Sequence, residues 1–281
     1  MQITPAPRTA AEFQDAPWRE VKLGQIGPAK NVPVMLSNQE RKLYYWLTSE
    51  WMRGVGDVAE LGTFVGGSTA HLAAGHEVAG HAGKIHMYDR FTSDAALKER
   101  MFYRNGIAHF EGEDILPLSQ VLLAPWADRL VWHKGEIQDG GWDGGPLEVL
   151  VVDAFKNAGY ADKMTADFFP SLIPGQSVVV HQDFLHWSQP WIAAQMVLFG
   201  DAFEPVAFVP EDTLVFLCKK RIDGEMLRKA AVAELGDAEI LRALETASEW
   251  LGHNKIRTRL AEAADGLRQN PGVRTSWLMS R

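Results

Sequence analysis

The sequence predicts an α/β fold: a doubly wound, Rossmann-like seven-stranded sheet that is mostly parallel, with its last strand antiparallel. Short and nearly continuous apolar runs alternate with segments of helical spacing, which is typical of parallel strands covered by helices on both faces. The last two apolar runs are joined only by Pro210-Glu211-Asp212, a connection short enough for an antiparallel hairpin. Beyond residue 221 the chain is rich in Ala, Leu and Glu and shows no further strand pattern.

The chain divides into three expected segments. Residues 1–35 contain Pro5, Pro7, Pro28 and Pro33 without sustained periodicity, which predicts an irregular N-terminal arm. Residues 36–221 contain all the strand patterns and form the expected α/β domain. Residues 222–281 form a helical C-terminal extension, broken by glycines at 236 and 252.

Within these segments the elements follow from their apolar spacing. Ser37-Asn-Gln-Glu40 fits a capping box, so the first helix is expected to begin at Ser37. The expected strands cover residues 55–61, 84–88, 130–133, 149–152, 177–181, 203–209 and 213–219. Further helices are expected over residues 68–78, 190–199, 225–235, 238–251 and 255–267.

The three C-terminal helices must bury their apolar faces, because isolated helices of this length are marginal in water. Seven side chains supply this apolar surface: Leu227, Ala231, Leu235, Ile240, Leu244, Trp250 and Leu260. They have two ways to be buried, on the chain's own helices or on a second subunit. We favour a homodimer, since the sheet is complete without the extension.

Composition and charge exclude several classes of protein. Lys and Arg number 28 against 36 Asp and Glu, a net charge of −8, and no basic stripe is present. Binding to nucleic acid or to an anionic membrane is therefore not expected. The longest apolar runs have strand length, the N-terminus lacks a secretory signal, and Cys218 is the only cysteine. We expect a soluble, cytoplasmic, globular protein without disulfides.

The most specific motif is Glu60-Leu-Gly-Thr-Phe-Val-Gly-Gly-Ser-Thr69, which follows the first strand and opens a helix. Gly62 permits a tight turn, while Gly66 and Gly67 permit a ligand to approach backbone donors at the helix N-terminus. The spacing G-x-x-x-G-G differs from the G-x-G-x-x-G of dinucleotide sites and argues against NAD. A tight turn that binds no ligand is the alternative.

Asp89 ends the second strand, where a carboxylate is able to accept hydrogen bonds from both ribose hydroxyls of an adenosyl ligand. A lone Asp at this kind of position is more often a cap or a loop residue. Its pairing with the glycine motif favours a role in ligand binding.

Together with Val-Val-Asp153 on the fourth strand, these motifs resemble the class I S-adenosylmethionine-dependent methyltransferases over about residues 37–220. The nearest resemblance is to small-molecule O-methyltransferases of the catechol/caffeoyl-CoA type and of the macrocin/cephalosporin-hydroxylase-like group. It implies S-adenosylmethionine (SAM) as cofactor and a small-molecule acceptor. It also implies a cofactor-binding set: Glu60, Gly62, Thr63, Gly66, Gly67, Ser68, Asp89, Glu136 and Asp153. In that set Glu60, Gly62 and Ser68 lie around the methionine portion, Asp89 holds the ribose and Glu136 flanks the adenine.

The resemblance further implies that Asp153, Gln182 and Asp183 bind Mg²⁺ or another divalent cation, which would hold and acidify the acceptor hydroxyl. Gln182 departs from the family pattern, in which an Asp stands here, and so removes one negative charge. Lys156 lies in a segment that resembles the source of a lysine general base. His186 is the alternative base, because its ordinary pKa of about 6.5 suits proton transfer at neutral pH.

Three aromatic residues, Trp142, Phe184 and Trp187, lie on loops where they line an acceptor pocket or cap the core. The function expected from these observations is methyl transfer from SAM to an oxygen of a small molecule. Two alternatives remain open: an NAD-dependent oxidoreductase on a similar sheet, and a SAM-binding protein without transfer activity. The substitution at Gln182 supports the second of these.

Overall fold

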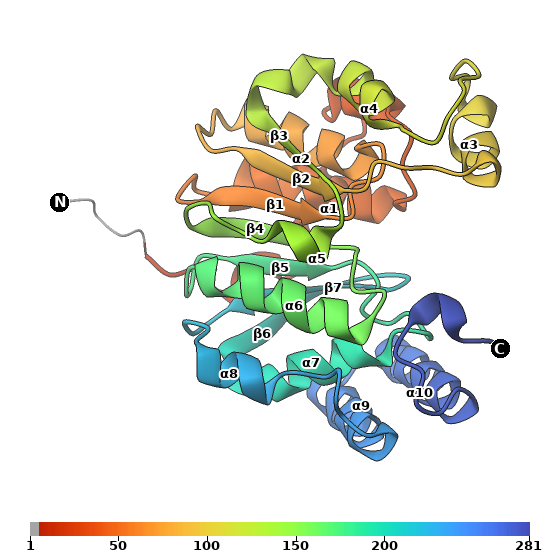
Figure 1. Ribbon diagram of the computed structural model, residues 1–281. Helices are drawn as coiled ribbons and strands as arrows, with labels where there is room; N and C mark the ends of the chain where they lie inside the picture. Colours follow the sequence, from red (N-terminus) through yellow and green to blue (C-terminus); the bar gives the residue numbers. More distant parts are fainter. Residues whose placement is uncertain (1–5) are drawn as a thin grey trace. The chain divides into compact units, whose positions relative to one another are not determined.

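The seven strands form a single sheet in the order β3-β2-β1-β4-β5-β7-β6 (Figure 1). The computed structural model describes residues 6–281, so the first five residues of the expected arm lie outside it. The strands are β1 (Asp57–Leu61), β2 (Ile85–Asp89), β3 (Leu130–Lys134), β4 (Leu147–Val152), β5 (Val178–His181), β6 (Phe203–Val209) and β7 (Thr213–Cys218). The chain adds strands outward from β1 to β3 and then from β4 in the other direction, which confirms the doubly wound sheet.

The pairing of the strands confirms the expected mixed sheet. β2 pairs in parallel with both β1 and β3. β7 pairs antiparallel with β6, through the short turn that the sequence indicates, and also antiparallel with β5. All residues of β4, β5 and β7 are buried, as the continuous apolar runs predict for strands covered on both faces.

The described residues form two compact units. The N-terminal unit comprises residues 15–140 and 147–150, and the C-terminal unit comprises the described residues up to Gln14, residues 141–146 and residues 151–281. Helices of the N-terminal unit are α1 (Asn38–Trp46), α2 (Gly67–Val78), α3 (Ala95–Met101), α4 (Leu116–Leu122) and α5 (Ile137–Gly140). Those of the C-terminal unit are α6 (Ala158–Phe168), α7 (Pro190–Phe199), α8 (Gly224–Lys229), α9 (Asp237–Leu251) and α10 (Asn254–Gln269).

Hydrogen bonds and buried side chains hold the beginning of α1 and the described part of the arm before it. The capping box forms as predicted, since the Glu40 amide donates to Ser37 Oγ at 3.3 Å and the Ser37 amide donates to Glu40 Oε2 at 2.7 Å. The arm is more regular than expected, with short 3-10 helices over Ala10–Phe13, Pro17–Glu20 and Gly27–Asn31. Within residues 6–35, apolar side chains such as Trp18 are buried and hold the arm in place.

The C-terminal extension belongs to the same compact unit as β5, β6 and β7. α9 and α10 lie where the sequence predicts, and they pack against each other and against α7. Ile240, Leu244 and Leu260 are at most 2% exposed, so these three side chains are buried within the chain. The homodimer stays a prediction. None of the helices in the described chain is long and apolar enough to cross a membrane.

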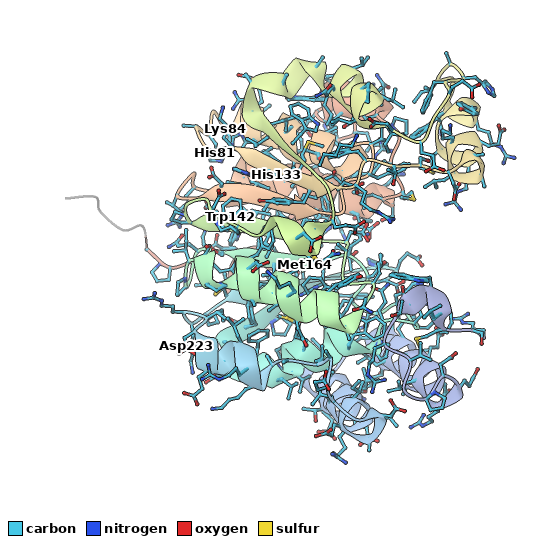
Figure 2. All side chains as sticks on the ribbon, viewed as in Figure 1. His81, Lys84, His133, Trp142, Met164 and Asp223 are labelled. Carbon is cyan, nitrogen blue, oxygen red and sulfur yellow. The ribbon has the colours of Figure 1, made fainter. Side chains whose placement is uncertain are left out.

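α8 is shorter than the expected helix over 225–235. It begins after Asp223, whose carboxylate caps it (labelled in Figure 2), and ends at Lys229. The Asp162 carboxylate on α6 then accepts hydrogen bonds from the amides of Val232 and Ala233, at 2.8–3.0 Å. These bonds replace helical ones, because the same amides cannot also donate to a preceding turn.

Candidate active site

The glycine-rich loop, residues 62–67, joins β1 to α2 and forms the tight turn that its sequence predicts. Gly62 and Gly66 have φ angles of 94° and 90°, which favour glycine. The Gly66 amide donates to the Thr63 carbonyl at 2.8 Å, and α2 begins at the next residue. The first turn of α2 therefore presents backbone N–H groups that have no partner within the helix.

Gly66 and Gly67 are also required by packing within the chain. A Cβ at Gly66 would lie 2.4 Å from Leu123 Cδ1, and one at Gly67 would lie 2.1 Å from the carbonyl oxygen of Pro33 in the arm. Protein atoms fill the space that side chains would need at both positions, so packing within the chain requires glycine there. That both glycines also let a ligand approach the backbone stays a prediction.

Asp89, at the end of β2, holds the glycine-rich loop in place. Its Oδ2 accepts the Phe64 amide at 2.8 Å and its Oδ1 accepts the Phe91 amide at 2.6 Å. Phe64 has a φ of 51° and its ring stacks on Phe102, with 5.3 Å between ring centroids. A carboxylate oxygen accepts more than one hydrogen bond, so these contacts are compatible with the expected bond to a ribose.

Polar side chains surround the first turn of α2. Glu60 is buried on β1, and its carboxylate accepts a hydrogen bond from the Thr69 hydroxyl of α2. Thr63 is 2% exposed, and its Oγ1 has no hydrogen-bond partner among the described residues. A buried hydroxyl without a partner is costly, which is typical of a position that a ligand completes. Ser68, half-buried, is the second residue of α2.

These residues fit SAM. Free helix N–H groups suit its carboxylate, the buried Glu60 carboxylate suits its ammonium group, and Asp89 suits its ribose hydroxyls. The fit at the expected adenine position is weaker. The Gly135 amide donates to the Asp89 carbonyl at 3.0 Å, but the Glu136 side chain is 51% exposed and lies 4.0 Å from Arg90.

A histidine that the sequence analysis missed supports the same turn of α2. His71 Nδ1 lies 2.7 Å from the Gly67 carbonyl oxygen, and Arg41 Nε donates to His71 Nε2 at 3.0 Å. Arg41 also donates to the Lys30 carbonyl at 2.8 Å, which ties the arm to α2. Burial lowers the pKa of His71 to about 4, so the ring is neutral at pH 7 with its proton on Nδ1. The sequence feature that indicates this role of His71 is its position four residues after Gly67, one helical turn away.

In the C-terminal unit, Asp153, Lys156 and Asp183 form a carboxylate–lysine cluster. Asp153 directly follows β4, and Asp183 lies two residues after β5. Lys156 Nζ donates to Asp153 Oδ1 at 2.9 Å and also to Asp183 Oδ2. Gln189, which no sequence pattern indicated, donates from Nε2 to Asp183 Oδ2 at 3.0 Å. The structure thus brings Asp153 and Asp183 together, as predicted.

The residues of this cluster do not fit the expected divalent metal. The Lys156 ammonium bridges the two carboxylates between which a cation would bind. Gln182 stands next to the cluster in sequence, and its amide and carbonyl bond to the Val152 carbonyl and the Thr213 hydroxyl. No group of three or more His, Cys, Asp or Glu side chains suited to a metal occurs in the described part of the chain.

His186 lies on the loop after β5 and is half-buried. Its pKa is lowered from the ordinary value, chiefly because burial disfavours the charged ring; Lys156, Arg259 and Arg281 act in the same direction and Asp212 opposes them. The ring nitrogen Nδ1 lies 3.0 Å from Ser188 Oγ. The Ser188 amide also donates to Nδ1, at 3.4 Å, so Nδ1 carries the lone pair that a general base needs and the proton of the neutral ring is on Nε2.

The end of the chain holds the loop that carries Lys156. The Ser276 amide donates to the Lys156 carbonyl at 2.8 Å, and the Ala158 amide donates to the Arg274 carbonyl at 2.9 Å. Asn157 Nδ2 adds a hydrogen bond to Thr275 Oγ1 at 2.7 Å. No local pattern predicts these contacts, because residues 274–276 lie more than a hundred positions from the loop.

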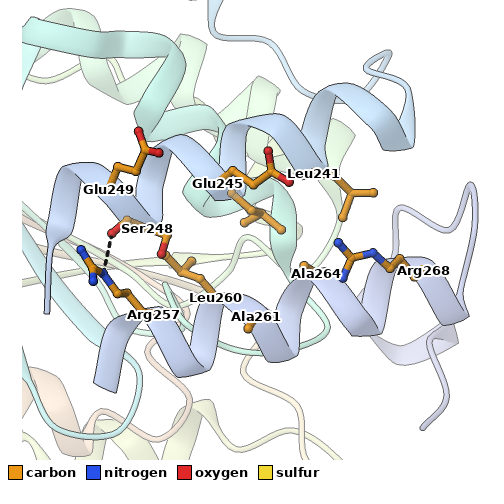
Figure 3. Close-up of a pocket in the computed structure, with 10 residues that line it drawn as sticks. Leu241, Glu245, Ser248, Glu249, Arg257, Leu260, Ala261, Ala264 and Arg268 are labelled. Carbon is orange, nitrogen blue, oxygen red and sulfur yellow. Dashed lines mark hydrogen bonds between the residues drawn. The ribbon is translucent and has the colours of Figure 1, made fainter. Parts of the chain in front are cut away.

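The three aromatic candidates separate into two groups. Phe184 is buried in the core, and Trp142 (Figure 2) packs on Phe168 and donates from Nε1 to the Gly145 carbonyl. Trp187 lies beneath the Arg281 guanidinium, 4.8 Å from the ring centroid, and lines a hollow of about 370 Å³. That hollow is completed by Glu262, Asp265, Gly266, Gln269 and Arg281. A groove of about 340 Å³ between α9 and α10 (Figure 3) contains none of the predicted site residues.

No protein-family model matches the sequence, and no curated protein matches it. Similar solved structures include cofactor-bound Rv0187 from MTB, with a TM-score of 0.46 and 19% identity over 78% of this chain and 100% of that one. An O-methyltransferase from Bacillus cereus in complex with SAH gives a TM-score of 0.48 and 15% identity, over 75% and 98% of the two chains. The O-methyltransferase NovP gives 0.46 and 15%, over 64% and 78%. We base the fold on the strand order and the function on the residues of this chain.

Proposed function

We propose that the protein is a SAM-dependent methyltransferase that methylates a hydroxyl oxygen of a small molecule. The observation that carries this proposal is the set of groups at the start of α2. There a glycine-rich loop held by a strand-end Asp89 meets the buried Glu60 carboxylate and the unpartnered Thr63 hydroxyl. This is a binding site for a ligand with a carboxylate, an ammonium group and vicinal hydroxyls.

Each group of the cofactor has a partner in the proposal. The N–H groups at the start of α2, from Gly67 and Ser68, bind the carboxylate, and Glu60 binds the ammonium group. Asp89 accepts hydrogen bonds from the ribose hydroxyls, and Thr63 Oγ1 donates to the bound ligand. Glu136 completes the proposed set near the adenine.

When bound, SAM supplies a methyl group whose C–S bond breaks, with its electron pair going to sulfur, as a lone pair of the acceptor oxygen forms the new C–O bond. His186 accepts the proton that leaves the hydroxyl, since burial keeps the imidazole neutral. Lys156 already donates to two carboxylates, so we assign it to orienting the acceptor instead of accepting its proton. Holding the acceptor in line with the methyl group is the main contribution of such a site to rate.

A SAM-binding protein without transfer activity is the second candidate. This second candidate is favoured by the pairing of Lys156 with both carboxylates, because the ammonium takes the place of the metal ion that the resemblance implies. An NAD-dependent oxidoreductase is disfavoured by the spacing of the glycines. Methyl transfer to a panel of small hydroxylated acceptors separates the two candidates, because only an enzyme produces S-adenosylhomocysteine (SAH) in an acceptor-dependent manner.

Cofactor binding is tested by calorimetry with SAH on the full chain and on Asp89→Ala. Loss of a charge-assisted contact to ribose is expected to weaken binding by about 1.5–3 kcal/mol. Asp94→Ala is the matched control, because Asp94 also accepts a backbone amide in the N-terminal unit, at the start of α3. Equal SAH affinity for the wild type and Asp89→Ala, or binding of NAD in preference to SAH, would contradict the proposal.

A further inference from the structure

The carboxylate–lysine cluster contains its own cation. Lys156 Nζ lies between the carboxylates of Asp153 and Asp183 and donates to both of them. Gln189 Nε2 adds a neutral donor to Asp183 Oδ2 at 3.0 Å. The side chains of Lys156, Asp153 and Asp183 are 36%, 34% and 22% exposed, so this charge pairing is partly shielded from water.

The backbone fixes the ammonium in this place. The Lys156 carbonyl accepts the Ser276 amide at 2.8 Å, and the Lys156 amide donates to the Ala154 carbonyl at 2.8 Å. The next residue, Asn157, is tied to Thr275 and caps α6 by accepting the Tyr160 amide at 3.1 Å. The peptide groups on both sides of Lys156 are therefore anchored, unlike those of a lysine on a free surface loop.

Charge balance then decides which cation the cluster holds. Two carboxylates and one ammonium carry a net charge of −1, and a divalent ion placed between the same oxygens would lie against the ammonium. The third expected ligand is the neutral Gln182. Divalent ions such as Mg²⁺ and Ca²⁺ are held by several oxygens with carboxylates among them, and this cluster offers two carboxylates that already have a partner.

We propose that the Lys156 ammonium is the permanent cation of this site and that it excludes divalent metal ions from the position between Asp153 and Asp183. The inference deepens the proposed function, because it makes acceptor binding independent of metal. The ammonium is then the hydrogen-bond donor to the acceptor oxygen, a part that a divalent ion would otherwise play. The acceptor needs only one oxygen to meet this donor, and not the two vicinal oxygens that a chelated metal favours.

The test measures Mn²⁺ binding by calorimetry on the full chain after treatment with a chelator. The wild type is expected to show no saturable binding up to millimolar Mn²⁺. Lys156→Met, which keeps the length of the side chain without its charge, is expected to bind Mn²⁺ at least tenfold more tightly. Lys156→Met combined with Gln182→Asp is expected to bind it more tightly still, since the third ligand gains a charge.

Two further variants control this experiment. Lys163→Met removes a lysine that pairs with Asp167 in the same unit and is expected to create no Mn²⁺ binding. Lys156→Arg keeps the positive charge and is also expected to bind none. If Lys156→Met folds poorly, Lys156→Gln takes its place as the neutral variant and is expected to bind Mn²⁺. Stoichiometric Mn²⁺ binding by the wild type would overturn the proposal.

Absence of binding in both the wild type and a folded Lys156→Met would overturn it as well, because the carboxylates would then not form a cation site. The readout needs neither SAM nor methyl transfer. Failure of SAH to bind would therefore remove the proposed function while leaving the result on the cation intact.

Discussion

The glycine-rich loop of the N-terminal unit and the carboxylate–lysine cluster of the C-terminal unit are built from different kinds of contact. The loop closes on itself through backbone bonds, such as Gly66 to Thr63, and is held by Asp89 one strand later. The cluster joins side chains from the loops after β4 and β5, and the end of the chain supports it. The first site is specified locally, and the second depends on contacts between distant parts of the sequence.

This difference makes distinct demands on the residues of each site. At Gly66 and Gly67 of the loop, close packing leaves no room for a side chain. In the cluster, charge and hydrogen-bond donors matter more than shape, and single contacts are replaceable. Substitutions in the loop are therefore expected to affect folding first, whereas substitutions around the cluster are expected to affect chemistry with smaller changes in stability.

The strongest test of this contrast is Gly66→Ala. The new side chain meets a strained φ of 90° and lies within 2.4 Å of Leu123 Cδ1. Strain of about 1–2 kcal/mol and overpacking of about 1–3 kcal/mol add, so the free energy of unfolding should fall by about 2–5 kcal/mol. Chemical denaturation followed by circular dichroism measures this loss.

The matched control for that prediction is Gly106→Ala. Gly106 has a similar φ of 82°, but no atom lies within 4 Å of an added Cβ. It should lose only the strain, about 1–2 kcal/mol. Equal losses of unfolding free energy in Gly66→Ala and Gly106→Ala would show that Leu123 moves aside and that packing does not specify the loop.

The same contrast explains how much the sequence revealed. The positions of the strands, the hairpin before Cys218 and the residues around Asp89 follow from local apolar patterns and motifs, which a chain carries within short windows. The pairing of Lys156 with Asp183 and its support by Ser276 have no local pattern, since they arise only when the chain folds. The metal was expected because the acidic positions matched a family pattern. That pattern does not indicate that the Lys156 ammonium pairs with both carboxylates.

An intermediate effect is expected from pH, through His71 beneath the glycine-rich loop. The pKa of His71 is about 4 in the folded chain, against about 6.5 when unfolded, so between these values the unfolded state binds more protons. Its contribution to stability is fully present above pH 6.5 and is lost as the pH falls toward 4. The limit of this loss is about 3 kcal/mol.

His71→Gln isolates this contribution, because the amide is able to donate to the Gly67 carbonyl and accept from Arg41 without titrating. The variant should lose less stability than the wild type between pH 7 and pH 4.5. His76 and His181, whose pKa values burial also lowers, to about 4 and about 3, contribute equally to both proteins. Identical pH profiles by denaturant titration would show that His71 has the same pKa in the folded and the unfolded chain.

The smallest expected effect on stability comes from Ser276→Pro, at the support of the carboxylate–lysine cluster. Ser276 is the first residue of a 3-10 helix, and Thr275 before it is extended, so proline fits the backbone and removes only the N–H that donates to the Lys156 carbonyl. The free energy of unfolding should fall by about 1 kcal/mol. SAH affinity should be unchanged, and KM for a methyl acceptor should rise, because Lys156 orients the acceptor in the proposed site.

Ser276→Ala keeps the N–H and should match the wild type in all three measurements. A rise in KM in both variants would assign the effect to the serine hydroxyl, and no rise in either would show that the end of the chain does not position Lys156.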